Sequence, residues 1–93
     1  MKIHLRYFAS FREAIGQHEE VLAVHEGASV VDVRALLLAR YPQLQPIIER
    51  SACAVNHGYV PVHTTLQEGD EVVFIPPVGG GTLHGQELRL WSL

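Results

Sequence analysis

The chain has 93 residues, of which 47% are hydrophobic and 18% charged, and its formal net charge at pH 7 is −3. This length predicts one domain with one modest core, and the composition excludes a disordered chain. A negative net charge without a basic stripe argues against a nucleic-acid partner, and no apolar run approaches the ~18 residues of a membrane span. Because the chain has a single cysteine and no signal-peptide pattern at its start, we expect a cytoplasmic protein without a membrane partner.

Two strands with a short helix between them are predicted at the start of the chain. Residues 2–8 alternate polar and apolar side chains up to Tyr7, and residues 19–24 are expected to form a second strand antiparallel to the first. Between them, Ser10 and Glu13 have the spacing of a helix capping box, and Gly16 is expected to end the short helix.

The main helix is expected to begin after Ser29, a residue type that caps helices, with Asp32 in the first turn, where the helix dipole favours a negative charge. Its apolar residues recur at spacings of three and four: Val30, Val33, Leu37 and Tyr41. Leu36 is expected to widen this apolar stripe. Pro42 ends the helix, because proline has no N–H for the helical ladder.

The second half of the chain predicts one short helix, over residues 45–50, and three short strands, over residues 52–56, 59–62 and 71–75. The Asn56-His57-Gly58 run is a turn signal between the first two of these strands. Pro61 restricts the strand that contains it to a sheet edge. The Glu68-Gly69-Asp70 turn precedes the last strand, whose apolar run ends at two prolines.

This order of elements predicts an α+β fold of the β-grasp (ubiquitin-like) type. In that fold a mixed sheet of four or five strands packs on one main helix, here with one or two short extra helices. A helix that crosses between parallel strands makes a right-handed connection, so the first and last strands are expected side by side in the sheet centre. The domain is expected to span residues 1–81, followed by a C-terminal extension over residues 82–93.

A Pro-Pro-Val-Gly-Gly-Gly stretch over residues 76–81 follows the last strand. The prolines end the strand because each lacks an N–H for the sheet ladder and has a fixed φ. The three glycines then form a segment without side chains whose φ is unrestricted. Such a segment is narrow enough to enter a channel in another protein, although a plain linker is the common role of a glycine run.

Four pieces of the sequence together resemble the small subunits of molybdopterin synthase, the MoaD branch of the MoaD/ThiS family of ubiquitin-like sulfur carriers. They are the run YFASFREAIG over residues 7–16, the Val55-Asn56 pair, the Gly69-Asp70-Glu71-Val72 run and the proline-glycine stretch over residues 76–81. The resemblance covers residues 2–81 in order. Sulfur carriers of thiamin synthesis are usually shorter and lack the first piece, so the molybdopterin branch is favoured.

In this family the last glycine of the domain carries the sulfur, and the matching position here is Gly81, preceded by Gly80. The resemblance implies that an adenylating enzyme of the ubiquitin-activating type uses ATP to convert the free carboxylate of this glycine to an acyl-adenylate. A sulfur donor then makes a thiocarboxylate. The tail would enter the MoaE-like large subunit, where the sulfur passes to a pterin precursor. The chain itself would be a non-catalytic carrier with no bound cofactor, and the catalytic residues would lie on the large subunit.

The family normally ends at the diglycine, whereas residues 82–93 follow Gly81 here. The carbonyl of an internal Gly81 belongs to an amide, which offers no carboxylate to adenylate. Three explanations stay open: a protease trims the chain after Gly81, the extension is a linker toward a fused domain, or this copy has lost the carrier role. Because the extension contains four leucines and Trp91, we expect it to dock on a hydrophobic patch.

The resemblance also implies an apolar contact between the sheet and the large subunit. The positions that match this contact or lead from it to the glycines are Phe8, Tyr59, Ile75, Pro76, Pro77 and Val78. A cluster of exposed apolar side chains beside a functional tail would mark an interface. The alternative is that the first three of these side chains fill the core.

Other functions compete with the carrier. A ubiquitin-like modifier or interaction module would use the same tail, joined through Gly81 to lysines of target proteins, and a carrier for thiamin biosynthesis would use the same thiocarboxylate. The six histidines form neither an i, i+4 pair nor a Cys/His cluster, so we expect no metal site. Cys53 lies in an apolar strand, and we expect a small core residue rather than a nucleophile.

Overall fold

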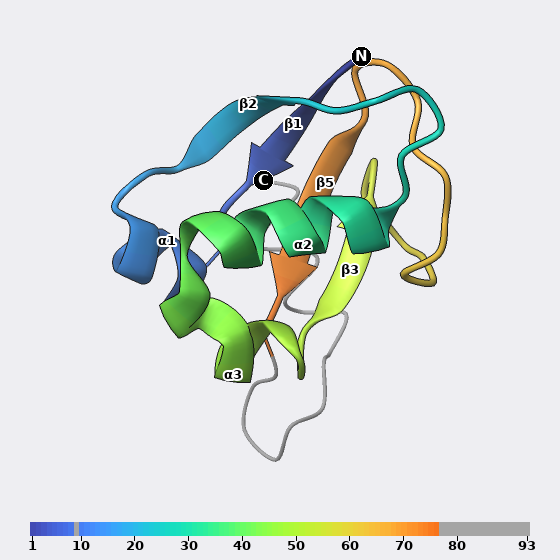
Figure 1. Cartoon of the computed structure of the whole chain (residues 1–93). Helices are drawn as coiled ribbons and strands as arrows, with labels where there is room; N and C mark the ends of the chain where they lie inside the picture. The colour runs from blue at the N-terminus through green and yellow to red at the C-terminus, as the bar shows by residue number, and fades with distance from the viewer. Residues whose placement is uncertain (9, 77–93) are drawn as a thin grey trace.

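In the computed structural model of the chain, residues 1–8 and 10–76 are described. The strands are β1 (Lys2–Arg6), β2 (Glu19–Ala23), β3 (Ala52–Val55), β4 (Gly58–Tyr59) and β5 (Glu71–Ile75). The helices are α1 (Ser10–Ile15), α2 (Val30–Arg40) and α3 (Gln45–Ile48), with the 3₁₀ helix η1 (Pro42–Leu44) before α3. The five strands form one mixed sheet, and these helices lie on one face of it (Figure 1). The expected α+β architecture of the β-grasp type is confirmed.

The strand order is β2-β1-β5-β3-β4, so the first and last strands lie side by side at the sheet centre, as expected. β1 and β5 run parallel, with Leu5 opposite Val72, whereas β2 pairs antiparallel with β1 and β3 with β5. β4 is only two residues long, shorter than the expected strand over residues 59–62. It ends before Pro61, which has no N–H to donate to the ladder. Because β5 is the middle strand, the chain leaves the sheet from the end of its central strand.

The main core lies between α2 and the face of the sheet that α2 covers. Three residues of α2 are buried in it: Val30, Val33 and Leu37. On the sheet side, Phe74 of β5 packs with Phe11 of α1, whose ring centroids are 6.5 Å apart. The expectation that Leu36 widens the buried stripe is wrong, because 46% of this residue is exposed. Leu36 lies on the β2 side of the helix, and β2 is an edge strand, so no further strand lies beneath this side of the helix.

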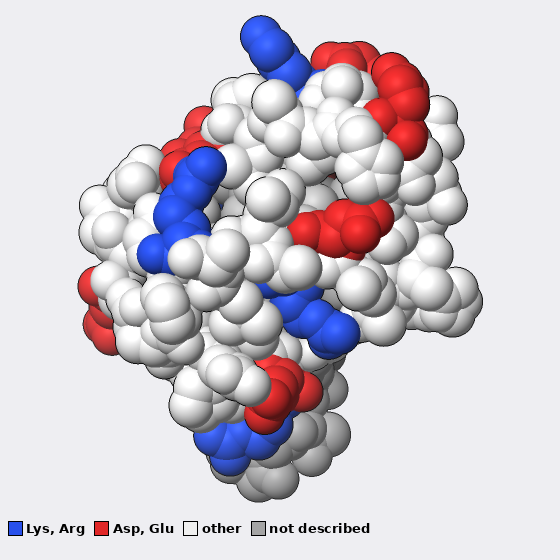
Figure 2. Space-filling model, in the orientation of Figure 1, with Lys and Arg blue, Asp and Glu red and all other residues white. Residues whose placement is uncertain are grey.

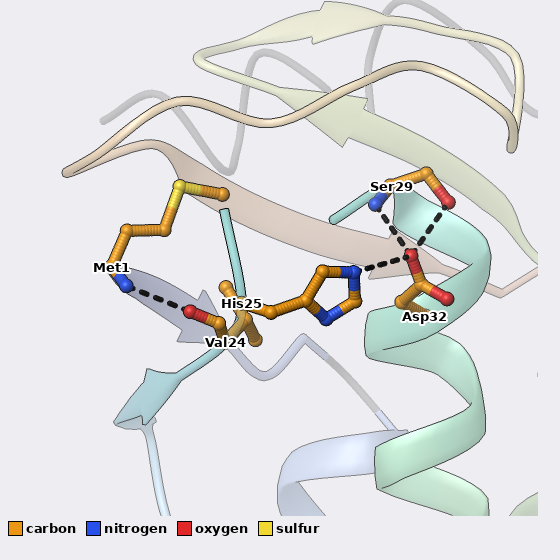
Figure 3. Close-up of polar contacts among 5 residues, drawn as sticks. All are labelled: Met1, Val24, His25, Ser29 and Asp32. Atoms are coloured by element: carbon orange, nitrogen blue, oxygen red, sulfur yellow. Dashed lines mark hydrogen bonds and ion pairs between the residues drawn. The ribbon is translucent and has the colours of Figure 1, made fainter. Parts of the chain in front are cut away.

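The start of α2 is fixed by Ser29 and Asp32, as the sequence predicts. The Asp32 carboxylate accepts hydrogen bonds from the Ser29 backbone N–H at 2.8 Å and from the Ser29 hydroxyl at 3.3 Å. The His25 ring, which follows β2, reaches across to the same carboxylate at 3.9 Å (Figure 3). The bond from the Ser29 N–H is the main cause that lowers the pKa of Asp32, so this carboxylate is charged at neutral pH.

The capping box expected for the short helix at Ser10 is not confirmed. Ser10 is the first residue of α1 rather than the residue before it. Gly16 follows the helix with φ of +83°, a left-handed conformation in which glycine has no Cβ penalty. The end of α1 is therefore placed where the sequence predicts it.

The face that carries the helices shows acidic and basic side chains interspersed over a largely uncharged surface (Figure 2). Among the described residues on this face, the Lys and Arg side chains do not join into a continuous basic field of the kind that binds a phosphate backbone. Among residues 1–8 and 10–76, no helix has the length and apolar character that a bilayer crossing needs.

Candidate functional site

The sheet face opposite the helices has a small apolar cluster of its own. Side chains alternate along β5, so Val72 and Phe74 face the main core while Val73 and Ile75 face the other side. Ala54 of β3 lies directly opposite Val73 in the register and packs with these two residues. The cluster sits on β5, the central strand of the sheet, and on its neighbour β3.

Phe8, which follows β1, packs against this second group of buried side chains. We call the group the exit cluster, and its members are Phe8, Ala54, Val73 and Ile75. The name reflects its place, because Ile75 is the last residue of β5 and Pro76, itself buried, comes next. The exit cluster thus lies next to the point from which the chain continues to the glycine stretch.

The three predicted interface residues are placed by the structure as neighbours on one sheet face. Phe8 is half-buried and contacts the cluster that contains Ile75, which is 1% exposed. Tyr59 of β4 is 45% exposed and lies opposite Ala54 in the β3–β4 register. None of the three belongs to the main core, but Ile75 is buried in a smaller core cluster of its own, so the alternative of a core role holds for Ile75 and not for the exposed Tyr59. Their contact with a large subunit stays a prediction.

The remaining predicted site residues fall outside the part of the chain that the structure describes. These are Pro77, Val78, Gly80 and Gly81. What the structure does define is the base from which they continue, since β5 is paired with β1 on one side and with β3 on the other. A strand held on both sides presents the following segment from a fixed point.

The first residue of β5 is held by the turn between β3 and β4. The side-chain oxygen of Asn56 accepts a hydrogen bond from the Glu71 N–H at 3.0 Å, and its amide group donates to the Asp70 carboxylate at 2.9 Å. Asn56 and His57 have φ of 49° and 74°, the left-handed values of a two-residue hairpin turn. Two pieces of the family resemblance, Val55-Asn56 and Gly69-Asp70-Glu71-Val72, therefore meet at this point.

Two contacts of the Glu71 carboxylate near this turn were not expected from the sequence. His57 Nε2 lies 3.1 Å from one Glu71 carboxylate oxygen, and the Arg6 guanidinium lies 3.8 Å from the other. These residues are far apart in the sequence, and only the parallel β1–β5 register brings Arg6 toward Glu71. The sequence signal for the Arg6–Glu71 contact is the alternation of side chains along β1 and β5. This alternation places Arg6 and Glu71 on the same sheet face as the exit cluster.

The chain just before Phe8 is anchored on the helix side of the sheet. The buried Tyr7 hydroxyl donates a hydrogen bond to the Glu20 carboxylate, which also pairs with Arg40 of α2 at 2.9 Å. Burial, followed by this hydrogen bond and the Glu20 charge, raises the pKa of Tyr7. β1, β2 and the end of α2 are thereby joined next to the residue that begins the exit cluster.

Cys53 is a core residue, as expected from its apolar neighbours. It is 4% exposed on the helix side of β3, and burial raises the pKa of its thiol to about 12. A protonated thiol is a poor nucleophile. Within the described residues, no group of three or more His, Cys, Asp or Glu side chains is placed to hold a metal ion.

The comparisons with known proteins agree with the fold and show the family. The model of the ThiS family matches residues 5–81. The molybdopterin synthase sulfur carrier subunit of Chlamydomonas reinhardtii is 36% identical over 83 residues, and that of Mycobacterium tuberculosis is 38% identical over 82 residues. Each alignment covers 87% of this chain and 99% or more of the relative. Small archaeal modifier protein 3 of Haloferax volcanii is 37% identical, over 87% of this chain and 100% of its own length.

Solved structures show the same fold. A putative molybdopterin converting factor subunit 1 from Pyrococcus furiosus superimposes with a TM-score of 0.74 at 32% identity, covering 83% of this chain and 98% of its own. A complex of subunits 1 and 2 of the molybdopterin-converting factor from Helicobacter pylori contains a chain with a TM-score of 0.64 at 23% identity, covering 86% and 99% of the two chains. At that identity the second match shows the fold alone.

Proposed function

The chain belongs to the ThiS family, and from this membership we propose that it is the sulfur carrier subunit of a molybdopterin synthase in molybdenum cofactor biosynthesis. One observation carries the proposal. The family match ends at Gly81, the second residue of the Gly80-Gly81 pair, and 87% of the chain accounts for almost the whole length of relatives that bear this name. The diglycine end of the match is therefore the position at which the sulfur would be carried.

The proposed chemistry needs Gly81 as a free acid. Its carboxylate attacks the α-phosphate of ATP, forming an acyl-adenylate and releasing pyrophosphate. Hydrosulfide supplied by a donor then attacks the activated carbonyl and expels AMP, and loss of its proton leaves the thiocarboxylate. Adenylation makes this substitution possible because it turns a poor leaving group into a good one. A glycine at this position has no Cβ to obstruct the incoming nucleophile.

The same chemistry requires the bond between Gly81 and Thr82 to be cut first. An amide at Gly81 has no oxygen anion to attack ATP, so we propose that a protease removes residues 82–93. ATP is then a substrate of the adenylating enzyme and no cofactor is bound by the carrier. We place the protein in the cytoplasm, where ATP is available to that enzyme.

The exit cluster is the surface that we propose contacts the large subunit. Ala54, Val73 and Ile75 are already buried, so the contact would fall on the half-buried Phe8 and the exposed Tyr59 beside them. One docking event would cover these two rings and direct the tail, which begins next to Ile75, into the partner. The Helicobacter pylori neighbour of the same fold is described as a protein–protein complex of subunits 1 and 2 of the molybdopterin-converting factor. The catalytic groups would belong to the large subunit, and this chain would be a carried substrate.

The proposal is tested with chains that end at Gly81 and at Leu93. Each is incubated with an adenylating enzyme, ATP and a sulfide source, and the intact mass is measured. We expect the shorter chain to exchange one oxygen for sulfur and the longer chain to stay unchanged, while a Gly81→Ala form of the shorter chain reacts poorly. A thiocarboxylate on the intact 93-residue chain, or none on the shorter one, would contradict the proposal.

A second candidate is supported by the similarity to small archaeal modifier protein 3. A ubiquitin-like modifier would use the same glycine terminus to form an isopeptide bond with lysines of other proteins. Mass spectrometry of cell extracts separates the two functions, because tryptic peptides with a glycine remnant on lysine indicate the modifier. Rescue of a host that lacks its molybdopterin synthase small subunit indicates the carrier, and rescue of a thiamin requirement instead indicates a carrier for thiamin biosynthesis.

A further inference from the structure

β2 forms a free edge of the sheet with unpaired backbone groups. The bonds from Tyr7 N–H to the His18 carbonyl and from Val24 N–H to the Met1 carbonyl, both 2.8 Å, define the hydrogen-bonded pairs of the β1–β2 ladder. Such pairs alternate along an antiparallel ladder, so the N–H and C=O groups between them point away from β1. These groups belong to Glu19, Val21 and Ala23, and none of them bonds to another described residue.

The two edge strands of the sheet differ in how well they are protected against pairing with a further strand. The opposite edge, β4, has two residues and is followed closely by Pro61, which discourages another strand from pairing there. β2 has five paired residues with no bulge or proline, and its central residue Val21 is 57% exposed. A strand of this kind is able to accept a further strand through main-chain hydrogen bonds.

A groove runs between this free edge and α2. Its cavity has a volume of about 400 Å³ and is lined by Ala23, Val24, His25, Asp32, Ala35 and Leu36. Apart from its polar end, the groove is apolar, and Leu36 on its helix side is 46% exposed. At the polar end the His25 ring and the Asp32 carboxylate face each other across the gap (Figure 3). The Asp32 oxygen that the Ser29 bonds leave unused is available to a cationic group.

We propose that the β2 edge and this groove bind an extended peptide segment of a partner protein, with alternating apolar side chains and a lysine or arginine at one end. The peptide would add a strand beside Val21, place apolar side chains between Leu36 and Val24, and bring its cation to Asp32. None of these residues belongs to the exit cluster or the tail, so the inference does not depend on the proposed function.

A partner peptide fits this surface better than a second copy of the chain. Stable protein–protein interfaces bury about 800 Å² on each partner, far more than a five-residue edge pairing offers. A copy paired through its own β2 would also bring the exposed Glu19 near a groove whose charged end is already a carboxylate. A basic peptide instead complements that charge.

The test uses a capped synthetic peptide, Lys-Ile-Thr-Val-Thr-Ile, titrated into the 93-residue protein. We expect the amides of Val21 and Ala23 to exchange rapidly with deuterium in the free protein and to become protected when the peptide binds. The amides of Leu22 and Val24, which point toward β1, should be protected in both states. A peptide with glutamate in place of lysine should bind several-fold more weakly, because it meets Asp32 with a like charge.

Matched variants locate the interaction. Val21→Pro removes an N–H that β1 does not use, and should weaken binding about tenfold, the equivalent of ~1.4 kcal/mol. Val21→Thr keeps that N–H and should bind almost normally. Leu36→Lys should weaken binding to a similar degree, and Leu36→Met should not. If Val21→Pro fails to fold, a peptide N-methylated at its central valine tests the same hydrogen bonds in the unaltered protein.

Three outcomes would overturn the inference. The first is no binding of the peptide at millimolar concentration. The second is binding that is unaffected by the N-methyl group and by Leu36→Lys. The third is protection of Val21 and Ala23 that rises with protein concentration in the absence of peptide, together with a dimer mass in sedimentation, since a second copy would then be the occupant.

Discussion

The side-chain oxygen of Asn56 accepts a 3.0 Å hydrogen bond from the backbone N–H of Glu71, and so joins the β3–β4 turn to the first residue of β5. The Asn56 backbone N–H donates in return to the Glu71 carbonyl at 2.9 Å. The turn therefore sets where β5 begins. Because β5 also ends at the exit cluster, these bonds act on the strand that leads to the glycine stretch.

We expect Asn56→Ala to lower the free energy of unfolding by about 1–2 kcal/mol. The change removes two exposed side-chain hydrogen bonds, each worth roughly 0.5–1.5 kcal/mol, and places an alanine at φ of 49°. Urea unfolding at pH 7 measures the difference. Asn56→Gly loses the same bonds but accepts a positive φ, so it should lose less stability. Equal stability of Asn56→Ala and the unaltered protein would contradict this account.

Because the Cys53 thiol is buried, we expect the protein to lose stability in alkaline solution. Burial raises the pKa of its thiol in the folded protein from 9.0 to about 12, so above pH 9 the unfolded chain loses a proton that the folded chain keeps. The stabilisation is therefore complete below pH 9 and declines as the pH rises toward 12, by at most ~1.4 kcal/mol per pH unit. Urea midpoints between pH 8 and pH 10 measure the decline, and Cys53→Ala should flatten it. An unchanged slope in that variant would assign the decline to other groups.

For Asp32 we expect a loss of stability in acid rather than in alkali. Its pKa is lowered chiefly by the bond from the Ser29 N–H, so its contribution to stability is present above the unfolded pKa of about 4 and is lost as the pH falls through the lower folded value. We expect Asp32→Ala to reduce the melting temperature at pH 7, with a difference from the unaltered protein that shrinks below pH 4. The control is Glu26→Ala, a loop carboxylate that does not cap α2. A difference that persists unchanged at pH 3 would exclude this role of the charge.

Much of this fold was predictable because its local signals agree with its long-range contacts. Ser29 and Pro42 delimit α2, and the apolar run between Asp70 and Pro76 defines β5 with the bounds that the structure shows. In each case a residue with a strong backbone preference lies next to a clear apolar pattern. The end of the family match at Gly81 could likewise be expected from the sequence.

The parts that were not predicted depend on contacts between distant segments. The exposure of Leu36 follows from the edge position of β2, which no local pattern around Leu36 encodes. The separation of Ile75 from the main core follows from the alternation of β5 between two faces that are both apolar, so its four buried residues read as one continuous run. The Arg6–Glu71 contact needs the parallel register of β1 and β5.

The exit cluster gives the last prediction, which follows from the proposed carrier function. Tyr59 is the exposed residue beside this cluster, and aromatic residues at the centre of interfaces often contribute most of the binding energy. We expect Tyr59→Arg to weaken binding of the chain ending at Gly81 to a molybdopterin synthase large subunit at least tenfold, with little change in melting temperature, since 45% of the residue is already exposed. Calorimetric titration measures the affinity. Tyr59→Phe should bind normally, and Leu36→Arg, which adds the same charge on the far side of α2, should do so as well. If Leu36→Arg weakens binding as much as Tyr59→Arg, the large subunit is contacting the helix side of the sheet rather than the exit cluster.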